Sequence, residues 1–509
     1  MEGYKHGIKS RENATSYPTP TTTENAVQVI FGTSPINLTE DPKQAVNRPV
    51  MARDFEEAQK ALGYSDDWEK YTLCQSMYAN SELFTISPVI YVNVLDPEKH
   101  SKQIETKTVR VEDHQAIVED KGMLVDELAI TMKPNSARVG SARTGEARTT
   151  EARTTEVGDE ITRGTDYITA FDNDGRLIIT LLSSGKAFDL SEITVSGKVI
   201  APELVTEEDL IGFCDVQTGT ETGLEVIRQI HPKLGVTPGL LLAPGWSHRP
   251  NVGAALQAKC EEISGVFASM CILDLDTEKV KKYTDCLTGK RDMGFDDKHG
   301  IVLWPMLLVD VGKINYSAVY GAMMGYYTAL NQDVPYIYPS NKGLNVNGAV
   351  LKDGTEVYLD QDQAGAVNGD GVVTVLHDGG EWKAFGNNTA AYPDNTDPKD
   401  RWIGCRRMFD FANNRFALDY RKKLDSNMNR RQVDDIINSF NIWANSLVSA
   451  GMCAGLYIEY RSDENSIEKV LEGHMRTRMH LAPYTPMEYI ENVTEFDISA
   501  LRNVMTEEG

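Results

Sequence analysis

The sequence predicts a multidomain α+β protein, in which an α/β core domain is interrupted by an inserted β-sandwich domain and followed by a C-terminal α+β domain. Three observations lead to this prediction. Apolar strands alternate with amphipathic helices in residues 25–95 and 201–345, strands with a two-residue period dominate residues 96–200, and a long amphipathic helix lies within residues 346–488. The 509 residues suffice for about three domains at roughly 150 residues each.

The core domain is predicted from short, continuously apolar strands that end at glycine or turn residues. Strand–helix–strand units at this spacing favour parallel pairing in a sheet that is covered on both faces. The helix starts and stops carry their own signals, such as Thr206 before an acidic first turn and Gly63 after an apolar face. The predicted strands span 26–32, 86–94, 239–245 and 270–275, and the predicted helices span 55–62, 206–210 and 252–268.

The insert is predicted from alternation of apolar and polar side chains, which is typical of half-buried strands. Its expected strands span 106–112, 128–132, 167–171 and 176–181. The tight turn Asp172–Gly175 joins the last two. Residues 136–155 repeat a five-residue motif, SARVG, SARTG, EARTT and EARTT, with almost nothing to bury. We interpret this repeat as a mobile surface loop, with an adhesive surface patch as the alternative.

The two ends of the chain are predicted to be extended arms. Residues 1–24 are polar and show no apolar period, so they can form no core of their own. Near the other end, Arg430–Ser449 is a predicted helix, followed by strands at 455–460 and 475–481. The last predicted strand, Tyr489–Phe496, has no covering element after it, so it needs a partner edge. Its apolar residues are Tyr489, Ile490, Val493 and Phe496.

Composition excludes several classes of function. The formal net charge of −24 disfavours wrapping of DNA or RNA, because phosphates would be repelled. The seven cysteines are widely spaced and form no CxxC pair, which argues against a disulfide framework and against a cysteine zinc site. The N-terminal segment resembles no signal peptide. The longest apolar stretch, residues 301–309, is about half the length of a membrane span and contains Pro305.

No catalytic constellation emerges, and we predict neither catalytic residue, cofactor nor metal site. The sequence contains no GxxxxGK[ST], HExxH or GxSxG motif. Ser247 and His248 are adjacent on a predicted loop, but a nucleophile and its base must converge in the fold. Residues 172–175 resemble the opening of a calcium loop, although their glycine is fourth where an EF-hand needs it sixth. The turn interpretation is therefore favoured.

Several stretches resemble the tail sheath family of contractile phages, R-type bacteriocins and related injection systems. Residues 26–36, AVQVIFGTSPI, are similar to the family's opening strand and its "GTAP" turn. The C-terminal third contains, in the family's order, GVVTV at 371–375, AFGNNT at 384–389 and WIGCRRMF at 402–409. The most specific signal is MRTRMHLAPYTPMEYI at 475–490, which matches a strand-AP-x-x-P-x-E-x-I pattern. The insert lies outside the resemblance.

The resemblance implies a structural protein that is not an enzyme. Sheath subunits of this family form stacked six-fold rings around an inner tail tube protein, with baseplate and tail terminator proteins at the ends. N- and C-terminal arms add strands to a neighbour's C-terminal sheet, which is therefore exchangeable. Contraction rotates the domains as rigid bodies from a metastable lattice, without nucleotide. The resemblance also implies assembly in a bacterial cytoplasm, with neither membrane insertion nor direct contact with nucleic acid.

The domain division that follows has a linking arm at each end. Its parts are an N-terminal arm (1–24), the core (25–95 and 201–345), the insert (96–200), a tube-facing domain (346–488) and a C-terminal arm (489–509). A basic cluster flanks the helix that the family turns toward the tube. We expect this cluster to face an acidic tube surface, with a solvated helix end as the alternative. The cluster comprises Arg421, Lys422, Lys423, Arg430 and Arg431.

Two other functions remain as alternatives from the sequence. One is a different structural role in a contractile tail, such as a baseplate or tail-tube protein. The other is an acidic α/β hydrolase. The acidity of the chain fits a phage tail, a bacteriocin and a secretion machine equally, because a sheath does not touch the cargo.

Deletion of residues 136–155 should leave assembly intact. The repeat has almost nothing to bury, so no core is lost when it is removed. Electron microscopy of the purified deletion variant should show the same tubes as the parent protein. Loss of tubes in this variant would instead place the repeat within the lattice contacts.

Overall fold

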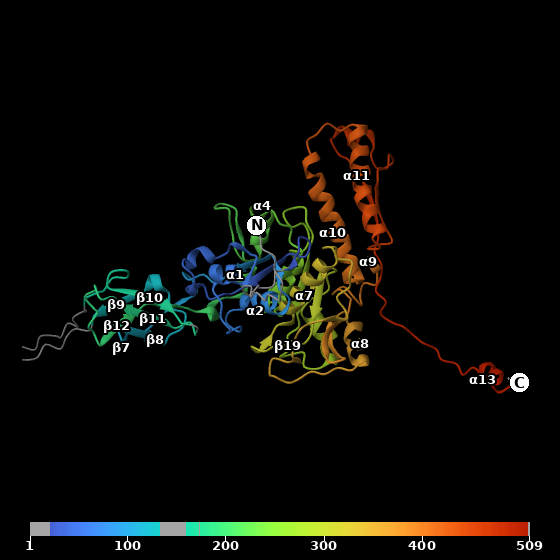
Figure 1. Cartoon of the computed structure of the whole chain (residues 1–509). Coiled ribbons are helices and arrows are strands. Elements are labelled where there is room, and N and C mark those ends of the chain that lie inside the picture. The colour runs from blue at the N-terminus through green and yellow to red at the C-terminus, as the bar shows by residue number, and fades with distance from the viewer. Residues whose placement is uncertain (1–20, 133–158, 173, 507–509) are drawn as a thin grey trace, which may run out of the picture.

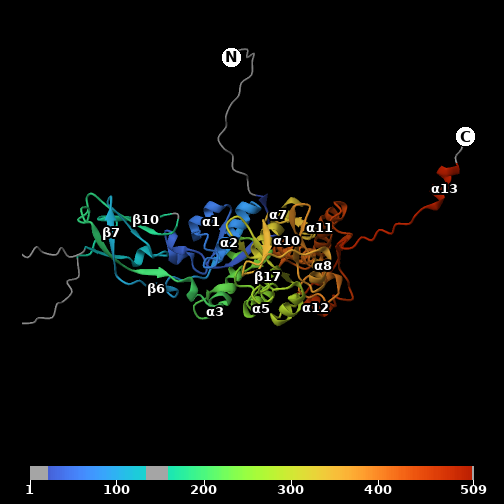
Figure 2. The same cartoon turned by 90° about the horizontal axis from the view of Figure 1, so that it is seen from below.

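The computed structural model describes residues 21–132, 159–172 and 174–506. The described chain is elongated, with the insert at one end, the central sheet in the middle and the C-terminal helices at the other end (Figures 1 and 2). After its last strand, the chain leads away from the body to a short terminal helix (Figure 1). The repeat 136–155 and most of the predicted N-terminal arm lie outside the described residues.

A six-stranded sheet forms the centre of the molecule. Its neighbours are parallel except at one edge, where β3 runs antiparallel to β5. Every residue of β2, β5 and β17 is buried, as expected for strands covered on both faces. This confirms the predicted parallel sheet. In order across the sheet, the strands are β18 (Gly300–Leu303), β17 (Met270–Asp274), β16 (Leu240–Leu242), β2 (Gln28–Gly32), β5 (Val89–Asn93) and β3 (Pro49–Ala52).

Helices predicted from their caps form where expected. In α1 (Phe55–Leu62), Asp54 caps the first turn, and the helix ends at Gly63 with φ of 74°. In α3 (Glu207–Ile211), Thr206 and Asp209 form a reciprocal capping box. The predicted helix 252–268 is wrong in its second half, because α5 (Pro250–Ala258) ends ten residues earlier. Glu262, Ser264 and Gly265 follow with positive φ, which no helix continues through.

The insert is a single six-stranded antiparallel sheet, which corrects the prediction of a β-sandwich. The sheet stays continuous because β7 pairs with β12 along most of its length and with β8 at its end. Alternate side chains of β8, β11 and β12 point into a separate apolar core. A two-stranded stalk, β6 (Ser101–Gln103) with β13 (Lys198–Ile200), leads to the central body. The strand order is β10 (Tyr167–Phe171), β11 (Leu177–Leu181), β8 (Gln115–Val118), β7 (Lys107–Glu112), β12 (Glu192–Ser196) and β9 (Ala129–Met132).

Residues 346–402 join the central core, unlike the predicted boundary at 346. β22 (Gly348–Val350) pairs with β19 (Met306–Leu308), and Val373 bridges to Leu303 at the end of β18. Their apolar side chains belong to the same buried cluster as the central sheet. Further elements of this region are α8 (Gln361–Gly369), β23 (Thr374–Asp378), β24 (Glu381–Phe385) and α9 (Pro398–Arg401). Two strands that precede residue 346 pair nearby, β20 (Lys313–Ile314) with β19 and β21 (Lys342–Gly343) with β24.

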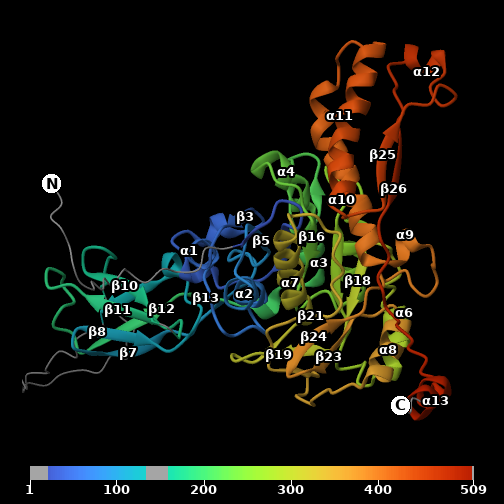
Figure 3. The same cartoon turned by 45° about the vertical axis from the view of Figure 1, so that its right-hand side comes forward.

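A separate apolar cluster holds together the C-terminal helical hairpin and its sheet. The hairpin consists of α10 (Ile403–Tyr420) and α11 (Arg430–Ser449), and β25 (Gly455–Glu459) pairs with β26 (Arg478–Ala482) beside it (Figure 3). The bounds of α11 confirm the predicted helix Arg430–Ser449. Its buried face is also the predicted one, although Ile437 remains partly exposed. The predicted face was Val433, Ile437, Phe440, Ala444 and Leu447.

The described part of the predicted N-terminal arm lies against the core. β1 (Thr21–Thr22) pairs in parallel with β4 (Ile86–Ser87), and Thr23 is buried. The predicted boundary at residue 24 therefore lies several residues inside the anchored segment. The remaining elements are α2 (Leu73–Tyr78), α4 (Ile227–Leu234), α6 (Cys286–Asp292), α7 (Tyr316–Leu330), α12 (Ile467–Leu471), α13 (Ile498–Thr506), β14 (Cys214–Asp215) and β15 (Thr220–Glu221). Among the described helices, none combines the length and apolarity that a membrane crossing requires.

Candidate assembly interface

The adjacent Ser247 and His248 do not form a catalytic pair. The Ser247 hydroxyl donates to Asp274 Oδ2 at 3.2 Å and accepts from the Asp274 backbone N–H at 3.1 Å. Asp274 also accepts from the Ser317 hydroxyl at 2.5 Å and from the Ser317 backbone N–H at 2.8 Å. Burial raises the pKa of the Asp274 carboxyl to about 6. This cluster ties β17 to the start of α7, so its role is structural.

The calcium-loop alternative at residues 172–175 is likewise unsupported. The Asp172 carboxylate accepts from Arg176 Nε at 2.8 Å and from the backbone N–H groups of Asp174 and Arg176. These bonds close a turn and occupy the oxygens that a cation would need. Within the described ranges, no group of three or more His, Cys, Asp or Glu side chains is placed to hold a metal ion.

The C-terminal sheet has one closed edge and one open edge. On the outer side of β25, Asn441 of α11 accepts from the Ile458 backbone N–H at 2.8 Å and donates to the Ile458 carbonyl at 3.0 Å. The amide thus replaces a neighbouring strand at that residue. On the other side, β26 pairs with no further strand among the described residues. Its outward backbone groups are available for a strand from another chain.

The segment after β26 is extended and exposed. The predicted strand Tyr489–Phe496 does not form within the single chain, because no strand edge lies beside it. Its four apolar side chains, Tyr489, Ile490, Val493 and Phe496, are 75% to 79% exposed. Leu501 of α13 is also exposed. An unpartnered apolar segment of this kind indicates a binding element.

The basic cluster lies at the free end of the helical hairpin, where α10 and α11 meet (Figures 1 and 3). Arg421, Lys422 and Lys423 form a 3₁₀ turn after α10, and Arg430 and Arg431 begin α11. All five are exposed. Arg430 pairs with Asp434 at 3.0 Å. No ion pair involves Arg421, Lys422 or Lys423 within the described part of the chain. The structure thus brings all five together on one surface.

A buried ionic network, which the sequence did not reveal, fixes the base of α10 to the core. Arg406 binds Asp410 at 2.8 Å and Asp400 at 3.2 Å. His299, only 2% exposed, lies between Asp410 at 3.5 Å and Asp297 at 3.2 Å. Buried charges of this kind are destabilising unless paired, so loss of one partner affects the whole network. These ion pairs tie the base of the hairpin to the core.

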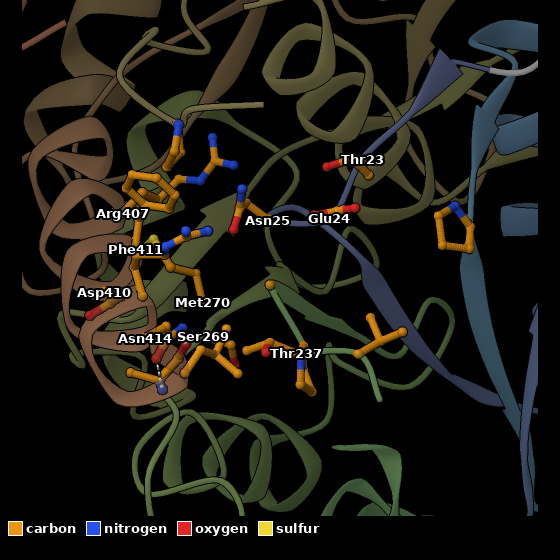
Figure 4. Close-up of a pocket in the computed structure, with 18 of the residues that line it drawn as sticks. Thr23, Glu24, Asn25, Thr237, Ser269, Met270, Arg407, Asp410, Phe411 and Asn414 are labelled. Carbon is orange, nitrogen blue, oxygen red and sulfur yellow. Dashed lines mark hydrogen bonds between the residues drawn. The ribbon is translucent and has the colours of Figure 1, made fainter. Parts of the chain in front are cut away.

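A pocket of about 600 Å³ separates α10 from the root of the N-terminal arm (Figure 4). Arg407 and Phe411 line the α10 side, and Glu24 and Asn25 line the opposite side. Burial lowers the pKa of Arg407 to about 10, and its guanidinium donates to Thr328 Oγ1 at 2.9 Å. Across from this gap, Thr23, Glu24 and Asn25 donate hydrogen bonds to Asp333.

Comparisons with known proteins agree with this architecture. No family model matches the chain. A curated relative, the prophage major tail sheath protein of Pseudomonas aeruginosa (strain UCBPP-PA14), is 23% identical over 279 residues. The match covers 53% of this chain and 68% of the relative.

Two solved sheath structures share the fold. The contracted sheath of the PVC extracellular contractile injection system has a TM-score of 0.53 at 12% identity, covering 98% of this chain and 100% of that chain. The contracted helical sheath of the anti-feeding prophage (AFP) has a TM-score of 0.52 at 12% identity, covering 96% and 99%. Both of these structures are contractile sheaths in the contracted state.

The buried network should make stability depend on pH. Burial alone would lower the pKa of His299, but its hydrogen bonds with Asp297 and Asp410 outweigh burial and raise the pKa to about 9. A raised pKa means that the imidazolium stabilises the fold fully below about pH 6.5, its usual pKa, and that this contribution disappears as pH rises through about 9. The contribution of His299 to the thermal midpoint should therefore fall across this window.

His299→Gln provides the comparison for this effect. Glutamine does not titrate, so the difference in thermal midpoint between the parent and the variant should be largest near pH 6 and shrink toward about pH 9.5. Taking the difference removes the contribution of Lys290, whose burial lowers its pKa to about 8 in the same range. A difference that stays constant with pH would show that folding leaves the pKa of His299 unchanged, and one that grows with pH would show that His299 is neutral in the fold.

Proposed function

We propose that the chain is a tail sheath protein and forms the contractile sheath around an inner tail tube, in stacked six-fold rings linked by exchanged strands. The observation that carries this proposal is that one chain has both an unpaired strand edge and an extended segment without a partner. β26 presents an open edge, and the segment after it is an exposed, apolar, extended chain. Figure 1 shows this segment leading away from the body, so it does not pair with the edge of its own sheet.

A neighbouring copy satisfies both needs at once. A donated strand converts free N–H and C=O groups on both partners into ladder hydrogen bonds, each contributing about 0.5–1.5 kcal/mol. Burial of each large apolar side chain adds about 1.5–3 kcal/mol. A single link is then worth several kcal/mol, and a lattice in which every subunit holds its neighbours becomes collectively permanent.

Asn441 favours β26 over β25 as the receiving edge for the C-terminal arm. The outer backbone groups of Ile458 in β25 are already bonded to the Asn441 amide. Met479 and Leu481 are central in β26, and their side chains are only partly buried. A strand added there extends the sheet and covers them. The exchanged sheet of the proposed lattice is therefore built outward from β26.

The basic cluster supports contact with an acidic tube surface. It lies at the free end of a rigid hairpin whose base is fixed by buried ion pairs. Positive charge at this end contrasts with a net charge of −24 for the chain. Complementary charge on a tube would steer assembly and fix register more than it would add affinity. Contraction then requires rotation of whole subunits, and the proposed energy store is the metastable extended lattice.

Truncation of the C-terminal arm should abolish tubes without unfolding the subunit. Deletion of residues 489–509 removes no buried side chain among those described, so circular dichroism and the thermal midpoint should match the parent protein. Negative-stain microscopy should show single subunits in place of sheaths. Deletion of residues 1–20 should act likewise, whereas deletion to residue 24 also removes the anchored Thr23.

A matched pair of substitutions separates the arm from general surface effects. Val493→Asp with Phe496→Asp should prevent assembly, because both side chains are expected to become buried in a neighbour. Phe213→Asp with Val216→Asp changes the same two residue types at exposed positions away from the arm and should leave tubes unchanged. Ordinary sheaths from the arm variant would reject strand exchange by this segment.

Charge reversal at the basic cluster should uncouple the sheath from its tube. Lys422→Glu with Lys423→Glu should yield sheaths that polymerise without a tube or contract early, with the defect strongest at low salt. Lys60→Glu with Lys121→Glu gives the same change in net charge at exposed sites elsewhere. Counting tube-filled particles by microscopy tests this, and equal counts for both variants at low salt would favour the solvated-end interpretation.

A further inference from the structure

The loop between α7 and β21, residues 331–341, holds the root of the N-terminal arm through Asp333. Its Oδ1 accepts from the Thr23 hydroxyl at 2.5 Å, and its Oδ2 accepts from the backbone N–H groups of Glu24 at 2.8 Å and Asn25 at 3.1 Å. The Asn25 side chain donates to Oδ2 at 3.0 Å and to the Asp333 carbonyl at 2.9 Å. All three oxygens of Asp333 therefore bind the arm root.

The same loop holds the root of the C-terminal arm through Tyr338. The Tyr338 hydroxyl donates to the Tyr484 carbonyl at 2.7 Å and lies 3.2 Å from Cys405 Sγ. Its ring lies so close to α10 that a Cβ on Gly404 would come within 2.7 Å of it. Cys405, 2% exposed, lies beneath this contact, so its thiol becomes accessible when the C-terminal root opens.

Asn387 makes a second bridge from the loop to the C-terminal arm. Its Oδ1 accepts from the Ser340 backbone N–H at 3.3 Å, and its Nδ2 donates to Glu488 Oε1 at 3.2 Å. Arg401 approaches the other oxygen of Glu488 at 3.9 Å. Glu488 is the acidic residue of the most specific sequence pattern, which therefore marks the point where the arm leaves the body.

The loop itself is held in an uncommon conformation. Gln332, Asp333 and Asn341 have backbone φ angles of 60°, 57° and 61°, which residues other than glycine rarely adopt. Such residues persist only where surrounding contacts fix them. Those contacts include the Asn341 backbone N–H to the Ala384 carbonyl at 2.7 Å. A shift at one end of so short and constrained a loop must displace the other end.

We propose that the 331–341 loop is a shared anchor that couples the two arm roots, so that release of either root loosens the other. In the proposed sheath, the two arms lead to different neighbours. Tension from one neighbour would then pass to the other through the few residues between Asp333 and Tyr338, without crossing the subunit body. This consequence rests on the proposed function, whereas the coupling itself belongs to the single chain.

The coupling can be measured on the full-length chain at concentrations where light scattering shows single subunits. Hydrogen exchange at the Glu24 and Asn25 amides reports on the N-terminal root. Maleimide labelling of Cys405, located by mass spectrometry, reports on the C-terminal root. Asp333→Ala should accelerate hydrogen exchange at the N-terminal root and also raise Cys405 labelling about five-fold or more. Tyr338→Phe should raise Cys405 labelling and also accelerate exchange at Glu24 and Asn25, since energetic coupling between sites is reciprocal.

Matched controls exclude general effects of the substitutions. Asp362→Ala and Tyr336→Phe change the same residue types without removing a hydrogen bond within the described residues, and both should match the parent protein. Labelling of the buried Cys260 reports unfolding of the core. If Asp333→Ala raises it, Asp333→Asn, which keeps one acceptor oxygen, replaces that variant in the comparison.

The proposal is overturned if each variant opens only its own root. The two anchors would be independent if Asp333 substitution leaves Cys405 labelling unchanged and Tyr338→Phe leaves exchange at Glu24 and Asn25 unchanged. The sheath function is tested separately by tube formation of the parent protein. Absence of tubes would reject that function while leaving the measured coupling in place.

Discussion

An open strand edge that its own chain cannot fill is the constraint on which the other features of this protein depend. One edge of β26 has unpaired backbone N–H and C=O groups, and such groups are usually hydrogen-bonded in folded proteins. The next segment of the chain points away from this edge. An isolated subunit is therefore incomplete at one edge and burdened with exposed apolar side chains at another. In the proposed function a second copy completes that edge, and repetition of the same contact builds the lattice.

A lattice that contracts also needs parts that do not deform. The buried pairs of Arg406 with Asp400 and Asp410, together with His299, fix the helical hairpin to the central sheet. Breaking such a network would leave an uncompensated buried charge, so hinge motion at this point is disfavoured. The insert, by contrast, has its own apolar core and is joined by a two-stranded stalk. The hairpin fixed by ion pairs and the insert joined by a stalk thus lie at opposite ends of the molecule.

The anchors of the arms show how an exchanged strand remains part of its own subunit. Asp333 and Tyr338 hold the two roots by hydrogen bonds, and the described part of the C-terminal arm beyond its root is exposed. Hydrogen bonds to a carboxylate are stronger than those between neutral groups, which suits a root under tension. Glu488 acts similarly through Asn387, so the point of departure of the C-terminal arm is defined to within a few residues.

The sequence by itself determined the local elements, including α1 with its caps, the full extent of α11 and the buried parallel strands, because periodicity and capping act over a few residues. It also placed the basic cluster at one helix end and identified Tyr489–Phe496 as a segment in need of a partner. Only the tertiary structure decided which strands share a sheet: the insert forms one sheet, and residues 346–402 join the central core. It also decided that Ser247 serves Asp274, that His299 meets Asp410, and that one loop reaches both arms. These contacts join residues far apart in the chain, and alternation or charge in a sequence does not specify the partner across such distances.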